Sequence, residues 1–258
     1  MYDNQFQMIR KRATWSNFYK YGKITNPDWL KSIIIDHEYY FPTSSELNDP
    51  AECKTTIFDH SKEEMESFLI AQYLNDYPNT SELEIEKIKY CIRNSDLKTI
   101  LNKEWWKTLN EHTGKTYGLF CLSKRPDNLA LWAHYADDHR GYCLEFANLG
   151  NLNVYEVSYG NKLPFSLDPC INQQTKNVEF LYTKAPEWEY EQEARILDKP
   201  GVMKFPPNFL KSIILGKNIS ETHMNMIIDW CKVREVKLQV KKAKFNDSLL
   251  RMEYLTIE

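Results

Sequence analysis

The chain has 258 residues, of which 42% are hydrophobic and 27% charged, the balance of an ordinary soluble globular protein. Only 8 residues are glycine, and neither G-x-x-x-x-G-K-[ST] nor G-x-G-x-x-G occurs, which excludes the two standard nucleotide-binding fingerprints. The formal net charge of −3 excludes a general electrostatic attraction to nucleic acids or anionic membranes.

The first part of the chain predicts a strand, a helix and a second strand. Residues 16–22, SNFYKYG, have the aromatic content of a short strand. A helix is expected to begin at NPDWLKSIII, because Asn26 can cap it and Pro27 suits its first turn. HEYYFPT is typical of a strand that Pro42 ends, and SSELNDPAE is rich in residues that form turns and loops.

The pattern changes between Ser61 and about His112. Apolar residues recur here near helical spacing, which predicts two or three amphipathic helices divided near YPNTS and RNS. Because strands are expected on both sides of this block, we interpret it as a helical insertion at about 61–112 in a single domain that spans residues 1–258.

The second half of the chain is mainly β. The expected elements are strands at 117–123, 141–147, 153–160, 189–197, 212–216 and 236–245, with short helices at 128–137 and about 220–232. Val236, Leu238 and Val240 are expected to face one way. The whole pattern predicts an α+β fold with a predominantly antiparallel β core and flanking helices.

The stretch EWEYEQEARI decides how the chain is interpreted. If residues 189–197 form a strand, Glu189, Glu191, Glu193 and Arg195 share one face. Three carboxylates in a row repel each other, and they become useful where they meet a cation, a developing positive charge or ribose hydroxyls. The arginine could keep one of them ionised or bind a phosphate. The alternative is a solvent-facing edge strand whose charges deter aggregation.

A second candidate stretch is LWAHYADDHRGYCLEF. On a helix, Trp132 and Tyr135 are three positions apart and could line one pocket wall, although core packing explains the tryptophan equally well. His134 and His139 are five positions apart, which is poor spacing for a zinc pair on a helix, so no metal site is expected.

The loop SELNDPAE is a third candidate. Asn48 and Asp49 before Pro50 could contact a ligand, or they could serve only to form the turn.

The cysteines and the N-terminus indicate the compartment. The 6 cysteines are scattered, and none forms a C-x-x-C or pairs with a nearby histidine, which favours buried, reduced thiols. Residues 1–10 lack the apolar core of a signal peptide, and no apolar run approaches the length of a membrane span. We therefore expect a soluble cytoplasmic protein with no membrane association.

Charge is unevenly distributed along the chain. Residues 199–251 contain eleven Lys and Arg against four Asp and Glu. This basic region could contact RNA or DNA, or its lysines could simply be solvated on helix and strand surfaces.

Taken together, these stretches resemble a bacterial family catalogued as domain-of-unknown-function family 2971. The resemblance covers nearly the whole chain in the right order, apart from the helical block. It rests on an early YKY strand, an NDP-E loop, a W-x-H-Y-A-x-x-H-x-G-x-C-L-x-F block and a late K…W-x-Y-E-x-E-x-R block. The matching residues are Tyr19, Lys20, Tyr21; Asn48, Asp49, Pro50, Glu52; Trp132, His134, Tyr135, Ala136, His139, Gly141, Cys143, Leu144, Phe146; and Lys184, Trp188, Tyr190, Glu191, Glu193, Arg195.

The order of these motifs is also similar to that of ADP-ribosyltransferases, which cleave NAD and pass ADP-ribose to a protein or a nucleic acid. The resemblance implies an ADP-ribosyltransferase-like fold in which Lys20 or Tyr21 contacts NAD from the first strand. It implies that Tyr135, with His134 nearby, belongs to the nicotinamide pocket. In that family a glutamate on a late strand is essential, which would be Glu193, with Glu191 two residues before it.

The chemistry of NAD cleavage agrees with these roles. Breaking the N-glycosidic bond generates an oxocarbenium-like ribose, which a nearby carboxylate stabilises. Arg195 or Lys184 could neutralise the pyrophosphate, Asn48 and Asp49 could contact the substrate from their loop, and Glu191 could orient or deprotonate the attacking nucleophile.

Two features depart from the transferase pattern. Lys20 stands where the first strand usually has Arg or His, and the usual Ser-Thr-Ser strand has only partial counterparts in LSK at 122–124 and VSY at 157–159.

We therefore expect an NAD-dependent ADP-ribosyltransferase, acting as a toxin or phage-defence effector that an inhibitory partner protein restrains. The basic region favours RNA or DNA over protein as its target. One alternative is a non-catalytic module that senses a nucleotide, and another is a nuclease that uses Asp49, Glu191 and Glu193 with Mg²⁺. Turnover of NAD, binding without turnover, and sensitivity to chelators distinguish the three.

Overall fold

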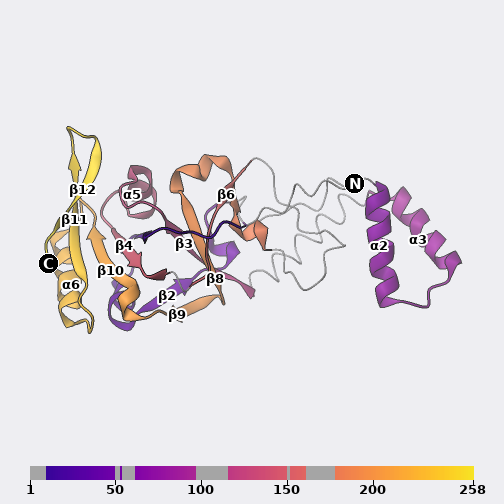
Figure 1. Cartoon of the computed structure of the whole chain (residues 1–258), viewed down its shortest axis with the longest axis horizontal. Coiled ribbons are helices and arrows are strands. Elements are labelled where there is room, and N and C mark those ends of the chain that lie inside the picture. The colour runs from indigo at the N-terminus through magenta and orange to yellow at the C-terminus, as the bar shows by residue number, and fades with distance from the viewer. Residues whose placement is uncertain (1–9, 50–52, 54–61, 97–115, 150–151, 161–177) are drawn as a thin grey trace.

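The computed structural model describes residues 10–49, 53, 62–96, 116–149, 152–160 and 178–258. An eight-stranded sheet forms the centre, in the order β12-β11-β10-β4-β1-β3-β8-β5 (Figure 1). Neighbouring strands are antiparallel except β10 and β11, so the expected α+β fold with a mostly antiparallel sheet is confirmed. The strands are β1 (Asn17–Gly22), β3 (Gly118–Ser123), β4 (Tyr142–Ala147), β5 (Val154–Glu156), β8 (Glu193–Asp198), β10 (Leu210–Leu215), β11 (Gln239–Asn246) and β12 (Arg251–Thr256).

The parallel pair β10 and β11 is joined by a crossover helix, α6 (Glu221–Val233), because parallel neighbours cannot be connected by a tight turn. The helix begins where the sequence predicts, since the Ser220 hydroxyl accepts a hydrogen bond from the His223 N–H at 3.2 Å. It buries Ile227 and Cys231 against the sheet. This crossover covers one face of the end of the sheet that is remote from β8.

The strand expected at 236–245 begins three residues later, at Gln239. Val236 is exposed and does not share the buried face of Leu238 and Val240, because it lies in the turn after α6. The segment expected as one strand at 153–160 divides into β5 and the short β6 (Ser158–Tyr159). β6 pairs in parallel with β7 (Thr183–Lys184), which brings a distant segment beside the main sheet.

The first helix, α1 (Pro27–Lys31), begins as the sequence predicts. Asn26 accepts a hydrogen bond from the Asp28 N–H at 3.0 Å, and a proline occupies the first turn. The helix continues into a π-helical turn, Ser32–Asp36, which ends at a left-handed residue before β2 (Glu38–Phe41).

Aromatic rings join β2 to the main sheet. β2 pairs with β9 (Gly201–Lys204) in a separate two-stranded sheet. The ring of Tyr39 lies 5.8 Å from that of Phe120, and Phe41 stacks on Phe120 at 5.1 Å. Each such pair contributes about 0.5–1.5 kcal/mol beyond its buried area. Tyr39 and Phe41 therefore belong to the hydrophobic core, whereas Tyr40 between them is exposed.

Two of the helices expected in the block at 61–112 are present, α2 (Lys62–Asp76) and α3 (Glu82–Asn94). Ser81 and Glu84 form a capping box at the start of α3. Two guanidinium nitrogens of Arg93 donate to the two carboxylate oxygens of Glu66 in α2. Residues 97–112, where a third helix was expected, lie outside the described residues. No helix within the described parts of the chain is both long and apolar enough to cross a membrane.

The turn after α5 (Leu129–Tyr135) uses an uncommon backbone conformation. Residues 137–139 all have positive φ, which L-residues adopt rarely. Gly216 is required opposite this turn, because a Cβ there would lie 2.1 Å from the carbonyl oxygen of His139. The His139 ring stacks on Trp132 with an interplanar angle of 8°. The His139 ring therefore packs against Trp132 in this turn.

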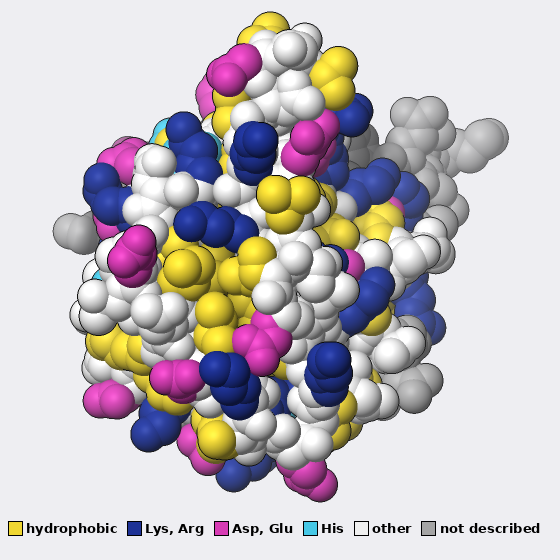
Figure 2. All heavy atoms as spheres, turned by 90° about the vertical axis from the view of Figure 1, so that its left-hand side faces the viewer, with side chains coloured by type: hydrophobic (Ala, Val, Ile, Leu, Met, Phe, Trp, Pro, Cys, Tyr) yellow, Lys and Arg dark blue, Asp and Glu magenta, His cyan; other side chains and the backbone are white. Residues whose placement is uncertain are grey.

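Most of the basic region at 199–251 lies in β10, α6, β11 and β12, at the end of the sheet remote from β8. Figure 2 shows the face at this end, where hydrophobic side chains occupy a hollow and side chains of both charges surround it. Several basic side chains here already have partners: Lys204 with Glu38, Lys211 and Lys241 with Glu145, Lys232 with Asp229, Arg251 with Glu253, and Arg234 with backbone carbonyls. These pairs reduce the positive charge available to a nucleic acid.

Arg234 provides a test of the packing around α6. Its guanidinium donates to the carbonyl oxygens of Ile34 at 2.8 Å, Pro207 at 2.6 Å and Val236. Arg234→Met removes all of these charged hydrogen bonds at once and leaves the carbonyl oxygens without their donor. It is therefore expected to lower the free energy of unfolding by about 3 kcal/mol in urea denaturation. Lys232→Met, which removes a mostly exposed ion pair, should cost less than about 1 kcal/mol. Equal losses would contradict this role of Arg234.

Candidate functional site

The segment EWEYEQEARI is not one strand, so the expected strand at 189–197 is wrong in its first half. Residues Pro186–Glu191 form a 3₁₀ helix, η5, and Gln192 has a left-handed conformation, with φ 45°, before β8 begins at Glu193. Glu191 and Glu193 therefore belong to different elements, and only Glu193 and Arg195 share a strand face. The proline after Ala185, with acidic residues in the next turn, is the sequence signal for this helix.

The alternative of a solvent-facing edge strand is also wrong. β8 lies between β3 and β5 in the sheet. Its charged side chains are buried, with exposed fractions of 5% for Glu193 and 0% for Arg195, and Glu191 is 5% exposed. Buried charges are tolerated only where they are paired, so the charged row forms an internal ionic network.

Arg195 is the best-held member of this network. Its Nε donates to Glu193 Oε1 at 2.7 Å and its Nη2 to Glu193 Oε2 at 3.0 Å, a bidentate pair. Its Nη1 donates to the Leu181 carbonyl at 2.6 Å and contacts Cys53 Sγ at 3.8 Å. Burial lowers the pKa of Arg195 to about 9, an effect that the nearby Asp49 opposes, so the guanidinium stays charged at neutral pH.

Lys184 connects the two glutamates. Its Nζ lies 2.7 Å from Glu191 Oε2 and 3.4 Å from Glu193 Oε2. Burial by itself would lower the pKa of Lys184, but the carboxylates of Glu193 and Glu191 outweigh it, and the pKa lies above its ordinary value. Burial also raises the pKa of Glu193, which Lys184 opposes. The ammonium is therefore the counter-ion that the two carboxylates share.

Tyr135 completes the environment of Glu191. Its hydroxyl donates to Glu191 Oε1 at 2.7 Å and accepts from Asn48 Nδ2 at 3.1 Å. Burial, followed by the hydrogen bond to Glu191, raises the pKa of Tyr135, so it remains a donor. Asn48 thus reaches the carboxylate of Glu191 through Tyr135. Lys184 and Tyr135 each hold one oxygen of the same carboxylate.

The position of η5 depends on residues that sequence inspection missed. The Asn128 side chain caps α5 by accepting from Ala130 N, and its Nδ2 donates to the Tyr190 carbonyl at 2.6 Å. Ser123 Oγ donates to the Glu191 carbonyl at 2.8 Å. Only the Asn128 cap has a sequence signal, since Asn precedes the apolar run of α5.

Tyr159 is a further missed residue. Its hydroxyl accepts from the Glu193 backbone N–H at 2.7 Å. Burial raises the pKa of Tyr159, so this hydroxyl stays neutral. Residue 159 stands opposite Lys184 in the short parallel pair of β6 and β7, a contact that no local pattern predicts.

Lys20 enters the site where strands β1 and β3 separate. These strands share only the pair Tyr19–Ser123, whereas β1 pairs with β4 along its whole length. Beside the gap, Lys20 Nζ donates to the Cys121 carbonyl at 3.2 Å and lies 4.5 Å from the centre of the Phe120 ring. Burial lowers the pKa of Lys20.

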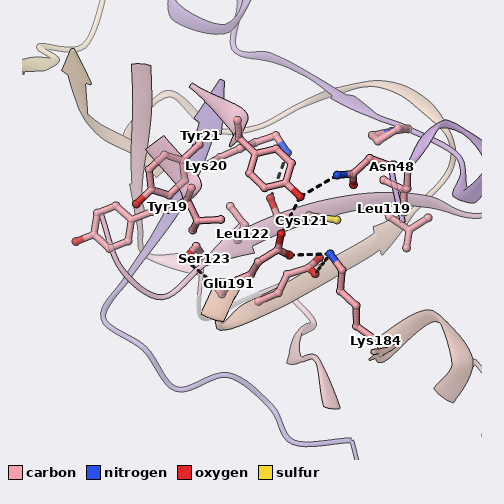
Figure 3. Close-up of a pocket in the computed structure, with 15 residues that line it drawn as sticks. Tyr19, Lys20, Tyr21, Asn48, Leu119, Cys121, Leu122, Ser123, Lys184 and Glu191 are labelled. Atoms are coloured by element: carbon pink, nitrogen blue, oxygen red, sulfur yellow. Dashed lines mark hydrogen bonds and ion pairs between the residues drawn. The ribbon is translucent and has the colours of Figure 1, made fainter. Parts of the chain in front are cut away.

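A cavity of about 170 Å³ lies at this separation (Figure 3). Figure 3 shows the ammonium of Lys184 meeting the carboxylate of Glu191 at the cavity, with Lys20 reaching in from β1. A cavity of about 150 Å³ is enough for one benzene ring. It is lined by Tyr19, Lys20, Tyr21, Pro42, Leu47, Asn48, Leu119, Cys121, Leu122, Ser123, Leu131, Tyr135, Lys184, Glu191 and Glu193.

Three other expected site residues lie around the cavity rather than in it. His134 is exposed, and its Nδ1 lies 3.2 Å from the Tyr190 hydroxyl. Asp49 and Arg195 are buried behind the lining, where they interact electrostatically. Tyr21 does line the cavity, although its hydroxyl donates to the Arg125 carbonyl at 2.8 Å.

The carboxylates of the site do not form a metal centre. Among the described residues, no group of three His, Cys, Asp or Glu side chains is arranged to hold a metal ion. Lys184 and Arg195 occupy the positions beside Glu191 and Glu193 that a cation would need.

Residues 131–196 match the model of a family described as proteins of unknown function, DUF2971. This segment contains Tyr135, Lys184, Glu191, Glu193 and Arg195, and the match supports the resemblance to that family. No curated protein and no solved structure matches the chain.

The buried ion pair can be compared with an exposed one of the same geometry. Arg195 and Arg125 both bind a carboxylate two positions away with two nitrogens, but Arg125 is 55% exposed. Arg195→Met is expected to lower the free energy of unfolding by about 3–5 kcal/mol, because Glu193 is left buried without its main partner. Arg125→Met should cost less than about 1 kcal/mol in the same urea titration. Similar losses would show that burial does not decide the cost.

The raised pKa of Lys184 predicts an alkaline loss of stability. A raised pKa means that the contribution of Lys184 is fully present below its unfolded value, about 10.5, and is lost as the pH rises above it. The difference in unfolding free energy between wild type and Lys184→Met should therefore be constant from pH 7 to 9. It should narrow by up to about 1.4 kcal/mol per pH unit above pH 10.5. A difference that does not change up to pH 11.5 would contradict the ionic role.

Proposed function

We propose that the protein cleaves the bond between nicotinamide and ribose in NAD and transfers ADP-ribose to an acceptor. The observation that supports this most directly is the position of Glu191. Its carboxylate lines a cavity large enough for one aromatic ring, and Tyr135 and Lys184 hold its two oxygens. An ionised carboxylate beside a pocket for one ring is the arrangement that this cleavage needs.

The reaction would use this carboxylate against a positive charge. When the bond between the ribose C1′ and the pyridinium nitrogen breaks, its electron pair goes to the nitrogen and leaves neutral nicotinamide. The positive charge develops on the ribose, and a fixed carboxylate stabilises it. The acceptor nucleophile then forms a bond to C1′ and loses its proton, for which Glu191 is the base.

Among the two glutamates, we assign the catalytic role to Glu191 and a positioning role to Glu193. Both oxygens of Glu193 accept hydrogen bonds from Arg195, and one of them also accepts from Lys184 at 3.4 Å. Glu191 has one contact on each oxygen and retains acceptor capacity toward the cavity. This reverses the order that the transferase resemblance implies.

The acceptor and the biological role extend this proposal. Exposed lysines at the remote end of the sheet, such as Lys217, Lys237 and Lys244, favour RNA or DNA over protein as acceptor. The resemblance to ADP-ribosyltransferases extends the proposal to action in the cytoplasm as a toxin or phage-defence effector with an inhibitory partner protein.

A second candidate is a module that binds a nucleotide without turnover. The network favours it in one respect, because Lys184 and Arg195 already neutralise both glutamates. A cluster whose charges are balanced without a ligand can serve simply to shape a pocket. The two candidates differ in whether bound NAD is consumed.

Release of nicotinamide from NAD tests the proposal. We expect the purified protein, supplied with cell lysate as a source of acceptors, to release nicotinamide, and Glu191→Gln to reduce the rate by roughly a hundredfold or more. The Glu191→Gln variant should remain folded, because glutamine has the size of glutamate, its oxygen can accept from Lys184, and the Tyr135 hydroxyl can accept from its amide nitrogen. Asp198→Asn, an exposed change at the other end of β8, should leave the rate unchanged. Labelled NAD would identify the acceptor class. Binding of NAD with no release by the wild type would favour the sensing module.

A further inference from the structure

An aromatic ledge formed by His134, Trp188 and Tyr190 stands beside the cavity. The ring centres of Trp188 and Tyr190 are 6.1 Å apart, and those of Tyr190 and His134 are 6.2 Å apart. All three side chains are at least partly accessible, and His134 is exposed. The catalytic chemistry proposed for Glu191 makes no use of these rings.

The geometry of η5 places this ledge against the candidate site. In a 3₁₀ helix, side chains three positions apart lie above each other, so Trp188 and Glu191 project on one side. Lys184 Nζ contacts both, at 4.8 Å from the centre of the Trp188 ring and 2.7 Å from Glu191 Oε2. At the other end of the ledge, the His134 ring lies 6.4 Å from that of Tyr135, which lines the cavity. The ledge therefore adjoins the cavity at both ends.

The size of the cavity requires a second binding surface. At about 170 Å³ it accommodates one aromatic ring, whereas a dinucleotide carries two bases. The second base must lie outside the cavity, within reach of the same ligand. A nucleobase stacks favourably on aromatic side chains whatever its identity, with a gain of about 1–3 kcal/mol per base.

We propose that the aromatic ledge stacks the purine base of the dinucleotide substrate while the cavity holds the nicotinamide ring. This rests on the proposed function, and it specifies that both halves of the dinucleotide are recognised. The charges of η5 favour this ligand over a base of a nucleic-acid acceptor. Glu187 and Glu189 are exposed carboxylates on the same helix, and they repel a nucleic acid, with a phosphate at every nucleotide, more than a dinucleotide with a single pyrophosphate. They can also accept hydrogen bonds from ribose hydroxyls or an amino group.

The test measures binding of the two halves of the ligand separately. ADP-ribose lacks the nicotinamide ring, and nicotinamide mononucleotide lacks the purine. Trp188→Ala and His134→Ala are each expected to weaken ADP-ribose binding by about tenfold or more in titration calorimetry, and to leave binding of nicotinamide mononucleotide unchanged. Trp29→Ala, which removes an exposed tryptophan from α1, should leave the affinity for both ligands unchanged.

Two further variants distinguish stacking by Trp188 from its packing against Lys184. Trp188→Phe keeps an aromatic face and should restore most of the affinity for ADP-ribose. Trp188→Leu keeps an apolar cover on Lys184 without an aromatic face, and its affinity should fall as in Trp188→Ala. Recovery of affinity in the leucine variant would overturn the proposal, because it would assign the loss to packing.

Other results also overturn the inference. These are undetectable binding of ADP-ribose by the wild type, unchanged affinity in the Trp188→Ala and His134→Ala variants, or equal weakening of both ligands. Loss of binding to a labelled single-stranded oligonucleotide, with ADP-ribose unaffected, would assign the ledge to an acceptor instead.

The two proposals fail in different ways. Ledge-dependent binding of ADP-ribose without nicotinamide release would retain the ledge and reject the cleavage. Nicotinamide release that depends on Glu191, together with normal ADP-ribose binding by the ledge variants, would reject only the proposed role of the ledge.

Discussion

The structure around the cavity depends on one ionic network, in which Arg195 binds Glu193 and Lys184 bridges Glu193 and Glu191. All four residues are at most 5% exposed. Removing a charge from water costs several kcal/mol per ion, and the cost is recovered only if each charge keeps close partners. Two cations against two anions, with the Leu181 carbonyl and the Tyr135 hydroxyl as additional partners, satisfy that condition. Hydrophobic residues of similar volume could stabilise the same space, so the network points to a requirement other than stability.

The network gains its importance from the segments that it joins. Lys184 comes from a two-residue strand, Glu191 from a 3₁₀ helix, Glu193 from the sheet, and Tyr135 from α5. None of the short segments is long enough to be held by its own hydrogen bonds. The contacts to Lys184 and Tyr135 therefore hold Glu191 at the point where β1 and β3 separate. The cavity exists because the ladder between these strands is limited to a single pair, and the network keeps one wall of the opening in place.

Sequence reasoning predicted the regular elements better than the site. The Asn26 cap, the start of α6 at Ser220 and the apolar strand 117–123 all have local causes, namely a capping side chain or an apolar run, and all are confirmed. The expectation that Lys20, Tyr135 and Glu193 belong to one site came from motif order, because contacts between distant segments leave no local pattern. The contribution of Tyr159 could not be predicted for the same reason. The prediction that side chains alternate between the two faces of a strand is wrong at Glu189 and Glu191. These residues lie in a 3₁₀ helix that begins at a proline and ends at a left-handed residue.

That failure explains why the two glutamates of the E-x-E pattern are not equivalent. In a continuous strand, Glu191 and Glu193 would project from the same face with the same surroundings. Instead, Gln192, with φ 45°, lies between them as the residue at which the 3₁₀ helix ends and after which β8 begins. The change of direction leaves Glu193 in the sheet, where Arg195 on the same face takes both of its oxygens. It leaves Glu191 at the end of η5, where Tyr135 and Lys184 hold its carboxylate at the cavity. A single left-handed residue thus divides the pair into a carboxylate that anchors the network and one that can act on a ligand.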